Sequence, residues 1–346
     1  GVSVFVAQPP WPWLVAYLVL LFGGAYYWRR RQTQPGEQPL PSFWEKAGPW
    51  ILGTAALATV LWLVFPRFPW VPAGRLTLHL LDVGQGESLV AEFPDGRVLV
   101  LDGGGFYKNS LDVGGRVVGP FLWSRGINKI DWLGATHSDQ DHVSGVESLL
   151  ERFRVGHLLD REDGIGDPRL QRLRVRAEAL GVPRLVLRPG EPLAIGEVRL
   201  RLLHPAPEYI AQLGDKVPKR AGNDLSWVLR LDYRDFSMLL TGDITRKVER
   251  WLVQSGAPLR VKVLKAAHHG SRTSSSAGFI RAAGAGDVLF SSGYMNYFRH
   301  PHPEVEARFL RSGARMWRTD RMGAIHITTD GVTHSIRGHP FLSRFD

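Results

Sequence analysis

Four side chains that can bind a metal ion occupy six consecutive positions, in the stretch HSDQDH at residues 137–142. They are His137, Asp139, Asp141 and His142. Two carboxylates and two imidazoles in one tight turn would be poorly solvated unless cations filled the space between them. An exposed acidic turn, in which Asp141 caps the following helix, is the alternative. The sequence has no cysteine, so a metal ion must be held by His, Asp, Glu or Asn side chains.

Short β runs separated by helical or turn segments follow Pro72, and this pattern predicts a layered α/β domain. The expected strands are Leu76–Leu81, Arg97–Leu101, Ile130–Thr136, His157–Asp160, Glu197–Leu203, Leu225–Tyr233, Phe236–Thr241, Val261–Ala266, Asp287–Ser291 and Ala324–Thr328. The expected helices are Val143–Phe153, Pro168–Leu180, Arg246–Gln254, Ser276–Ala283 and Pro303–Arg311. Three of these strands lead directly into His or Asp residues, in the segments HSDQDH, GDI and HHGS. Strands that end at one edge of a sheet bring such side chains together.

The order and spacing of four motifs resemble those of the metallo-β-lactamase superfamily. The motifs are the Asp102-Gly-Gly turn, HSDQDH, Thr241-Gly-Asp243 and His268-His269-Gly-Ser. HSDQDH corresponds to the HxHxDH motif of that superfamily, with Asp139 where the second His usually stands. The resemblance implies an α/β fold of the metallo-β-lactamase type, an αββα sandwich.

Within the superfamily, five segments are similar to the C-terminal hydrolase domain of the ComEC family, the DNA-uptake channels of natural competence. They are LDVGQGES at 81–88, HSDQDH, NDLS at 223–226, TGD at 241–243 and KAAHHGS at 265–271. The resemblance covers roughly Arg75 to Arg337. The hydrophobic segments before the domain also match the arrangement in that family.

The resemblance implies a pair of metal ions. The first ion would be held by His137, Asp139 and Asp243, and the second by Asp141, His142, Asp243 and His269. His268 is the alternative to His269 as a ligand. Asn223 falls near the place of another family ligand, normally His, and Asp102 resembles a buried Asp that braces the metal loops without binding metal.

Manganese is the metal that we expect at both positions, with zinc and magnesium as alternatives. The reason is that Asp139 adds a hard oxygen and a negative charge where an imidazole usually stands. For catalysis, we expect Asp141 to orient the attacking water. The expected substrate is a phosphodiester. Hydrogen bonds to its phosphoryl oxygens are expected from Lys265, His268, Ser271 and His300. For Lys265 the alternative is a surface lysine, and for His300 a packed loop histidine.

Two uncharged hydrophobic stretches, Trp11–Trp28 and Ala47–Pro66, precede the domain. At about 1.5 Å per residue they reach roughly 27 and 30 Å, close to the thickness of a bilayer. We therefore expect two transmembrane helices within a membrane segment at residues 1–72 and the hydrolase domain at residues 73–346; two buried helices of a soluble core are the alternative. Because Arg29–Arg31 begin the loop between the stretches, the positive-inside rule places the hydrolase domain outside the cytoplasm.

The formal net charge of +10 favours an anionic partner such as nucleic acid or acidic lipid. Together with the resemblance, it predicts a metal-dependent deoxyribonuclease, acting as an exonuclease on the strand that is not imported during transformation. Expected partners are single- or double-stranded DNA, the cell membrane, the remainder of the channel and other competence proteins. Because the chain begins at Gly1, we expect it to be part of a longer protein. Another membrane-tethered phosphodiesterase, or a non-catalytic domain that threads DNA, are the alternatives.

Overall fold

The computed structural model describes residues 17–19, 22–24, 26, 53–54, 74–105, 111–161, 167–214 and 222–338. The two predicted transmembrane helices fall almost entirely outside these residues. In the described part of the chain, none of the helices has the length and hydropathy needed to cross a bilayer. The backbone separates into two compact units, one of residues 1–70 with 121–127 and one of residues 71–120 with 128–346. The second unit carries the motifs.

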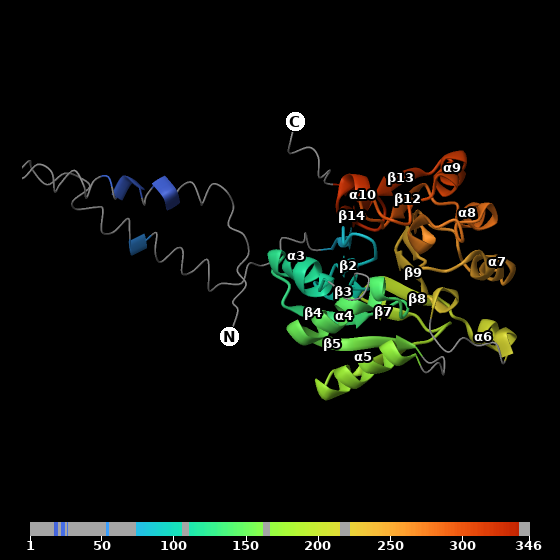
Figure 1. Ribbon diagram of the computed structural model, residues 1–346, viewed down its shortest axis with the longest axis horizontal. Helices are drawn as coiled ribbons and strands as arrows, with labels where there is room; N and C mark the ends of the chain where they lie inside the picture. Colours follow the sequence, from blue (N-terminus) through green and yellow to red (C-terminus); the bar gives the residue numbers. More distant parts are fainter. Residues whose placement is uncertain are drawn as a thin grey trace, which may run out of the picture. The chain divides into compact units, whose positions relative to one another are not determined.

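Two β-sheets form the body of the second unit (Figure 1). The first sheet has the strand order β15-β14-β1-β2-β3-β4-β5-β6. Its strands are β1 Leu76–Leu80, β2 Leu89–Glu92, β3 Val98–Leu101, β4 Lys129–Gly134, β5 Arg154–Arg161, β6 Arg184–Leu187, β14 Ile325–Thr329 and β15 His334–Gly338. Strands β3 to β6 are parallel to one another, and the other neighbours are antiparallel.

The second sheet has the strand order β13-β12-β11-β10-β9-β8-β7. Its strands are β7 Leu193–Ile195, β8 Val198–His204, β9 Val228–Tyr233, β10 Phe236–Leu240, β11 Val263–Lys265, β12 Asp287–Phe290 and β13 Arg315–Arg318. Strands β10 to β13 are parallel, so their carboxyl ends meet at one edge. This edge is where the TGD and HHGS segments lie.

The main core lies between the two sheets. Successive side chains of a strand point to opposite faces, and Leu76, Leu78 and Leu80 of β1 all point inward, where they join Phe236 and Met238 of β10. The other face of β1 is buried as well. Strands that are buried on both faces require a helical layer outside each sheet.

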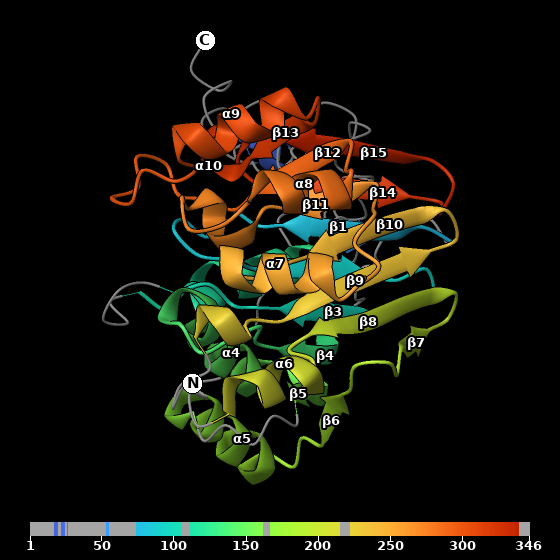
Figure 2. The same cartoon turned by 90° about the vertical axis from the view of Figure 1, so that its right-hand side faces the viewer.

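Helices cover the outer faces of both sheets (Figures 1 and 2). On the second sheet, side chains of α6, α7, α8 and α9 share a buried cluster with β9 to β12. On the first sheet, α4 contacts β4 and α5 contacts α4. The helices are α3 Gly119–Ser124, α4 Gln140–Arg152, α5 Pro168–Ala179, α6 Pro207–Leu213, α7 Arg246–Gln254, α8 Ala277–Ala283, α9 Pro303–Arg311 and α10 Thr319–Met322, with shorter helical turns η2 Gly114–Val118, η4 Asn223–Leu225 and η5 Ala267–Gly270. The expected αββα sandwich is confirmed.

All ten expected strands and all five expected helices are present, with ends that differ by a few residues. Strands β2, β6, β7, β13 and β15 and helices α3, α6 and α10 were not predicted. Of these, β2 follows directly on the LDVGQGES segment, and β7 has only three residues. Helix α4 begins at Gln140 rather than at Val143, so that Asp141 and His142 lie in its first turn.

Candidate metal centre

Four chain segments that follow strands of the two sheets carry the predicted site residues to one place. The end of β4 leads into His137 and into helix α4. The ends of β10 and β11 lead to Asp243 and His269, and β12 ends next to Ser291. The positions that the sequence analysis singled out at three separate strand ends therefore meet in space.

Three of the predicted ligands form the centre of the site. His142 Nε2 lies 3.4 Å from Asp243 Oδ1, and His269 Nε2 lies 3.3 Å from Asp243 Oδ2. The two Nε2 atoms are themselves 3.3 Å apart. Together with Glu87, these side chains form a buried group whose candidate ligand atoms all lie within 4.8 Å of one another.

The outer nitrogens of the two imidazoles fix the orientation of the rings. His142 Nδ1 lies 2.8 Å from a carboxylate oxygen of Asp102, and His269 Nδ1 lies 2.8 Å from the carbonyl oxygen of Ser291. Each Nδ1–H therefore donates to an oxygen, which leaves the Nε2 lone pairs of the neutral rings directed at one another. Two lone pairs at 3.3 Å repel unless a proton or a metal ion lies between them. These residues fit a metal ion.

The pKa values show how strongly this group attracts positive charge. Burial alone would lower the pKa of His269, but the carboxylates of Asp243 and Asp141 raise it to about 9. In the same way the charges of Asp243 and Asp102 overcome burial and hold the pKa of His142 well above its usual range. The pKa of Asp243 is held far below its usual range, against burial, by His269 and His142. Divalent metal ions would replace the protons that these shifts represent.

His137 and Asp139 form a second part of the site, in which Asp139 is partly exposed to solvent. His137 Nε2 lies 3.5 Å from Asp139 Oδ2, and the rings of His137 and His142 have centroids 4.1 Å apart. His137 is buried, and its Nε2 and Asp243 Oδ1 have no hydrogen-bond partner among the residues that the structure describes. Buried polar atoms without a partner are costly, so these two atoms also fit a cation.

Asp141 stands at the open side of the site. Its side chain is 33% exposed, and its Oδ2 lies 3.4 Å from His269 Nε2. The alternative reading, in which Asp141 caps the next helix, is wrong, because Asp139 holds the N-cap position of α4. Asp139 itself makes no capping hydrogen bond through its side chain, so neither carboxylate is needed to start the helix.

Asp102 is fully buried behind His142. Its carboxylate accepts hydrogen bonds from the Thr136 backbone N–H at 2.7 Å and from the Thr136 hydroxyl at 2.8 Å, in addition to the bond from His142. Its backbone φ is 61°, in the left-handed region that Asp tolerates better than most residues. Asp102 therefore contacts His142, a candidate ligand, on the side of the ring that faces away from the cluster.

Lys265 is completely buried, so the alternative reading as a surface lysine is wrong. Its ammonium group pairs with the carboxylate of Glu87, donates to the Gly242 carbonyl at 3.1 Å and lies 3.8 Å from Asp243 Oδ1. Lys265 thus reaches the cluster through Asp243 and Glu87.

Glu87 was not among the residues predicted for the site, although it lies in LDVGQGES, one of the segments that carry the resemblance. Gly86 has a φ of 150°, and a Cβ added there would lie 2.5 Å from the Asp141 carbonyl oxygen. The Glu87 N–H donates to that same oxygen at 3.1 Å. The glycine lets this turn pack against the start of α4, and the turn places a carboxylate inside the site. The sequence does hold a signal for Glu87, because a charged residue stands there between a glycine-containing turn and a hydrophobic strand.

The remaining candidates surround the cluster at a greater distance. His268 Nε2 lies 3.8 Å from Asp243 Oδ2, while His268 Nδ1 lies 3.3 Å from the Asn223 amide nitrogen. The His269 nitrogen is closer to Asp243, in agreement with the preference for His269 as the ligand. The Ser271 hydroxyl hydrogen-bonds to Thr273, 3.0 Å away. Asn223 and Ser271 are therefore placed next to His268 rather than within the cluster.

His300 stacks on the ring of His269, a predicted metal ligand. Its ring centroid is 6.5 Å from that of His269 with an interplanar angle of 18°, and 5.8 Å from that of His268. Burial and the charge of the neighbouring histidines lower the pKa of His300 to about 4, and burial lowers the pKa of His268. Both rings are neutral near pH 7 and present N–H groups that can donate.

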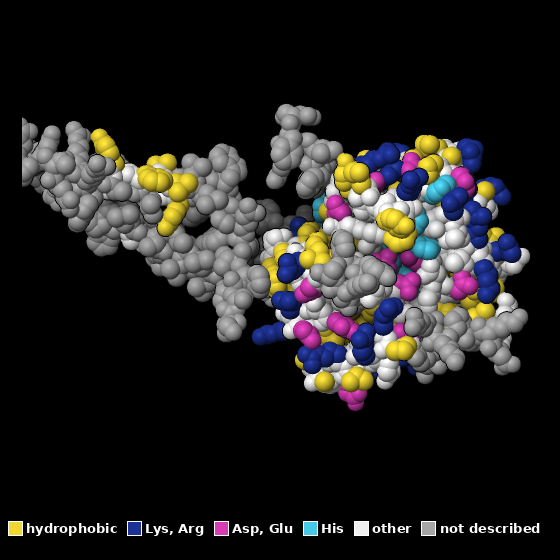
Figure 3. Space-filling view, viewed as in Figure 1, with side chains coloured by type: hydrophobic (Ala, Val, Ile, Leu, Met, Phe, Trp, Pro, Cys, Tyr) yellow, Lys and Arg dark blue, Asp and Glu magenta, His cyan; other side chains and the backbone are white. Residues whose placement is uncertain are grey.

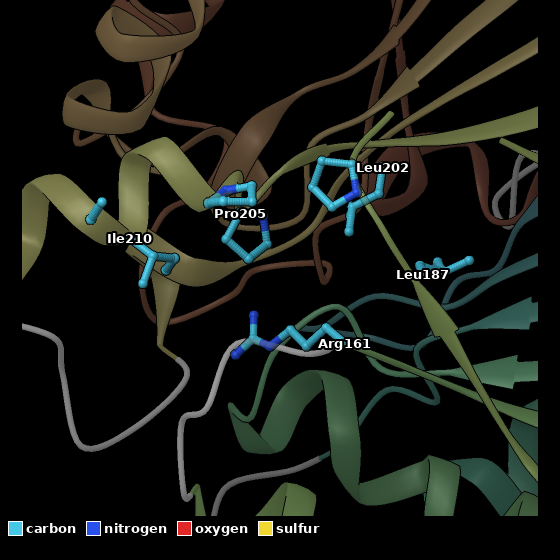
Figure 4. Close-up of a pocket in the computed structure, with 8 residues that line it drawn as sticks. Arg161, Leu187, Leu202, Pro205 and Ile210 are labelled. Atoms are coloured by element: carbon cyan, nitrogen blue, oxygen red, sulfur yellow. The ribbon is translucent and has the colours of Figure 1, made fainter. Parts of the chain in front are cut away.

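A separate pocket of about 320 Å³ lies between β8, α6 and the ends of β5 and β6 (Figure 4). Its walls are mainly leucine, isoleucine, alanine and proline side chains, with the guanidinium group of Arg161 at one side. None of the predicted site residues lines it. The chemistry described above belongs to the strand-end cluster.

Residues 81–293 match the sequence pattern of the metallo-β-lactamase superfamily, and this chain belongs to that superfamily. Its relatives include two proteins of the ComEC family. ComE operon protein 3 of Bacillus subtilis is 30% identical over 279 residues, which make up 77% of this chain and 34% of that protein. Competence protein ComA of Neisseria gonorrhoeae is 29% identical over 310 residues, 82% of this chain and 40% of that protein. The resemblance to the ComEC family is confirmed.

The chain spans between a third and two fifths of the length of these two curated relatives. Among solved structures, the metallo-β-lactamase fold protein YhfI of Bacillus subtilis is 11% identical, and the match covers 70% of this chain and 95% of that protein with a TM-score of 0.44.

Proposed function

We propose that this chain is a metal-dependent phosphodiesterase that hydrolyses DNA. The observation that carries the proposal is the convergence of His142, His269 and Asp243, with nitrogen and oxygen atoms 3.3 to 3.4 Å apart and the two imidazole Nε2 atoms facing one another. An arrangement of this kind is costly unless it holds a cation.

The proposed ligand set is the one that the family resemblance implies, and these contacts support it. One ion would be held by His142, His269, Asp141 and Asp243, and the other by His137, Asp139 and Asp243. Asp243 would be shared because its Oδ1 and the Nε2 of His137 are both buried without a hydrogen-bond partner among the residues that the structure describes. Two divalent ions bound here would activate a water molecule for attack on phosphorus and stabilise the charge on the phosphoryl oxygens.

Other residues of the chain would serve the reaction directly. Asp141, at the open side, can accept a hydrogen bond from the attacking water and so orient it. His268 and His300 are neutral and can donate to the phosphoryl oxygens of the substrate. Lys265, which is buried, would position Asp243 through its charge rather than touch the substrate.

Manganese is the metal that we propose, with zinc or magnesium as alternatives. Three aspartates, with Glu87 close by, give the site more hard oxygen ligands than imidazoles alone would, and oxygen ligands favour manganese or magnesium over zinc. Metal analysis of protein purified without added ions tests this. Tightly held stoichiometric zinc that supports full turnover would contradict it.

DNA is the proposed substrate because of charge and because of the relatives. The chain has a net charge of +10, and Arg246, Lys247 and Arg250 are exposed on α7, whose first residues follow Asp243 closely. Figure 3 shows lysine and arginine side chains gathered along one edge of the face that it presents. One curated relative is named Competence protein ComA and another ComE operon protein 3, and competence is a process in which DNA enters the cell.

In that process we propose an exonuclease that degrades the strand that is not imported, held at the cell membrane by the hydrophobic stretches at 11–28 and 47–66. The hydrolase domain would then lie outside the cytoplasm. Its partners would be single- or double-stranded DNA, the membrane, the remainder of the channel and other competence proteins.

The test is digestion of end-labelled linear DNA and of closed circular DNA by the 346-residue chain, with manganese, magnesium, zinc or a chelator. A variant carrying Asp139→Ala and Asp141→Ala is compared with Glu208→Gln, which changes an exposed carboxylate on α6. We expect metal-dependent loss of linear DNA only, abolished in the double variant and kept in Glu208→Gln. Absence of cleavage by folded, metal-loaded protein would favour a domain that threads DNA without cutting it or one that cuts other phosphodiesters.

A further inference from the structure

The loop between β12 and α9 presents large apolar side chains to solvent. Tyr294 is 71% exposed, Met295 84%, Tyr297 94% and Phe298 61%. Exposing several such side chains together forgoes the free energy of burying them, and a contiguous group of them is typical of a binding surface.

Hydrogen bonds hold this loop in shape. The Asn296 side-chain amide donates to the carbonyls of Gly293 and His300, at 2.9 and 2.6 Å, and its oxygen accepts from the His300 N–H at 2.9 Å. Met295 and Arg299 have φ values of 48° and 55°, which non-glycine residues adopt only when the surroundings impose them. The exposed rings are therefore presented by a defined backbone conformation.

The rings lead to the metal site. Phe298 stacks on His300 with centroids 5.7 Å apart and an interplanar angle of 24°, and His300 stacks on His269 at 6.5 Å and 18°. Tyr297 meets Phe298 edge to face at 5.8 Å. A series of aromatic rings thus runs from solvent to a proposed metal ligand. In Figure 3, hydrophobic side chains lie directly beside histidine side chains.

We infer that Tyr297 and Phe298 form a stacking platform for unpaired nucleobases of the DNA strand whose phosphodiester enters the metal site. The inference rests on the proposed function and names the form of its substrate, a single-stranded end. Bases in a duplex are already stacked and cannot lie on these rings, whereas unpaired bases can. Arg299, exposed in the same loop, adds positive charge next to the rings, which suits a nucleic acid strand.

A membrane surface would also accept exposed tyrosine and phenylalanine side chains. The stacking of Phe298 on His300 and of His300 on His269 favours DNA, because the platform is continuous with the site where the phosphodiester must bind. The membrane is therefore an outcome of the test rather than the proposal.

The test measures binding of two fluorescent single-stranded oligonucleotides to the full chain, one with all its bases and one with abasic sites near the 3′ and 5′ ends, in chelator so that no cleavage occurs. The variants are Tyr297→Ala, Phe298→Ala and the conservative Tyr297→Phe. Val332→Ala, which changes a 62% exposed side chain on the β14–β15 turn, is the control.

We expect unmodified chain to bind the complete oligonucleotide roughly five- to 100-fold more tightly than the abasic one, since a stacked base contributes about that much. Tyr297→Ala and Phe298→Ala should lose most of this difference, while Tyr297→Phe and Val332→Ala keep it. Equal affinity for the two oligonucleotides in the unmodified chain would overturn the inference. So would an equal loss for both in the alanine variants.

Unchanged DNA affinities together with weaker binding to vesicles of phosphatidylcholine and phosphatidylglycerol would also overturn it, and would assign the loop to a lipid surface. Hydrolysis is measured separately, with metal. Cleavage without any base preference would refute the platform alone, and base-dependent binding without cleavage would refute the nuclease alone.

Discussion

At the scale of single residues, the site is organised by what stands behind the ligands. Asp102 fixes the ring of His142 at 2.8 Å, and the Ser291 carbonyl fixes the ring of His269 at 2.8 Å. These contacts select the tautomer that leaves Nε2 free for a metal ion. The identity of the residues behind the ligands should therefore affect metal binding almost as much as that of the ligands themselves.

Replacing Asp102 by Asn should weaken metal binding by about 10- to 100-fold, because an amide no longer holds His142 in that tautomer or supports its basicity. Calorimetric titration of the metal-free protein with manganese measures this affinity. Asp235→Asn, which changes an exposed carboxylate in the β9–β10 turn, should leave the affinity unchanged. Unaltered affinity in a folded Asp102→Asn variant would show that Asp102 does not act on the site.

The protonation of His269 gives a pH dependence that should reverse when metal is added. In the folded chain without metal its pKa is raised to about 9, from an ordinary value near 6.5. A raised pKa stabilises the folded protein fully below pH 6.5, and this stabilisation is lost as the pH rises through about 9. Melting temperatures measured in chelator should therefore decrease as the pH is raised from 6.5 to about 9.

With saturating manganese the stabilisation should instead grow over the same pH range, because the metal binds deprotonated imidazoles. The two series of melting temperatures, in chelator and in manganese, are compared point by point. Parallel curves in the two conditions would contradict the assignment of His269 to a metal site.

At the scale of secondary-structure elements, glycines set how closely the metal-bearing turns approach helix α4. Gly103, next to Asp102, packs directly against Gly145 of α4, and a Cβ added to Gly145 would lie 2.0 Å from the Gly103 carbonyl oxygen. This contact fixes the distance between the turn that carries Asp102 and the helix that carries His142. A side chain at either position must push the two apart.

Gly145→Ala should therefore destabilise the protein by about 1–3 kcal/mol or more, as overpacking in a core does, and should weaken metal binding as well. Gly278→Ala is the matched control, since Gly278 also lies in a helix, α8, and has no atom within 4 Å of the added Cβ. It should be neutral or stabilising by up to about 1 kcal/mol. Urea denaturation measures both, and similar midpoints for the two variants would contradict the packing argument.

The predictability of the fold differed between elements for physical reasons. Long amphipathic helices such as α7 and α9 were predicted with both ends correct, because apolar side chains recur at helical spacing and Pro303 marks the start of α9. Short or edge strands such as β7 and β15 were not predicted, because three to five residues carry little periodicity. Strand β13 reads as polar, RMWR, and is a strand only through its pairing with β12.

The candidate site was more predictable than the fold around it wherever ligands are close in sequence. HSDQDH was predictable because it places four potential ligands within six consecutive residues. The pairing of Glu87 with the buried Lys265 was not predictable, because an ion pair between residues 178 positions apart in sequence arises only from the packing of the two sheets. The stacking of His300 on His269 likewise depends on the loop conformation after β12.

At the scale of the whole molecule, the distribution of charge would govern how the proposed DNA substrate reaches the site. The net charge is +10, although the cluster itself is rich in carboxylates. Under the proposed function, positive side chains outside the site would attract the DNA, and bound metal ions would neutralise the site locally. Exposed basic residues on α7 are the nearest in sequence to the Asp243 turn.

Neutralising Arg246, Lys247 and Arg250 together, each to Gln, should weaken binding of single-stranded DNA and flatten its salt dependence by about 0.7 in log–log slope for each phosphate contact removed. Arg172→Gln, on α5 in the other helical layer, is the control and should leave the slope as it is. The measurement is fluorescence anisotropy over a range of salt concentrations. A slope unchanged by the triple variant would place the DNA elsewhere on the surface.

The central claim is that DNA hydrolysis depends on a pair of metal ions that share Asp243. The most direct measurement is the rate of cleavage of labelled linear DNA while chelated protein is titrated with manganese and the bound metal is counted. We predict a rate that reaches its maximum at about two bound ions per chain and is abolished by Asp243→Asn. Full cleavage with no bound metal, or cleavage that survives Asp243→Asn, would contradict it.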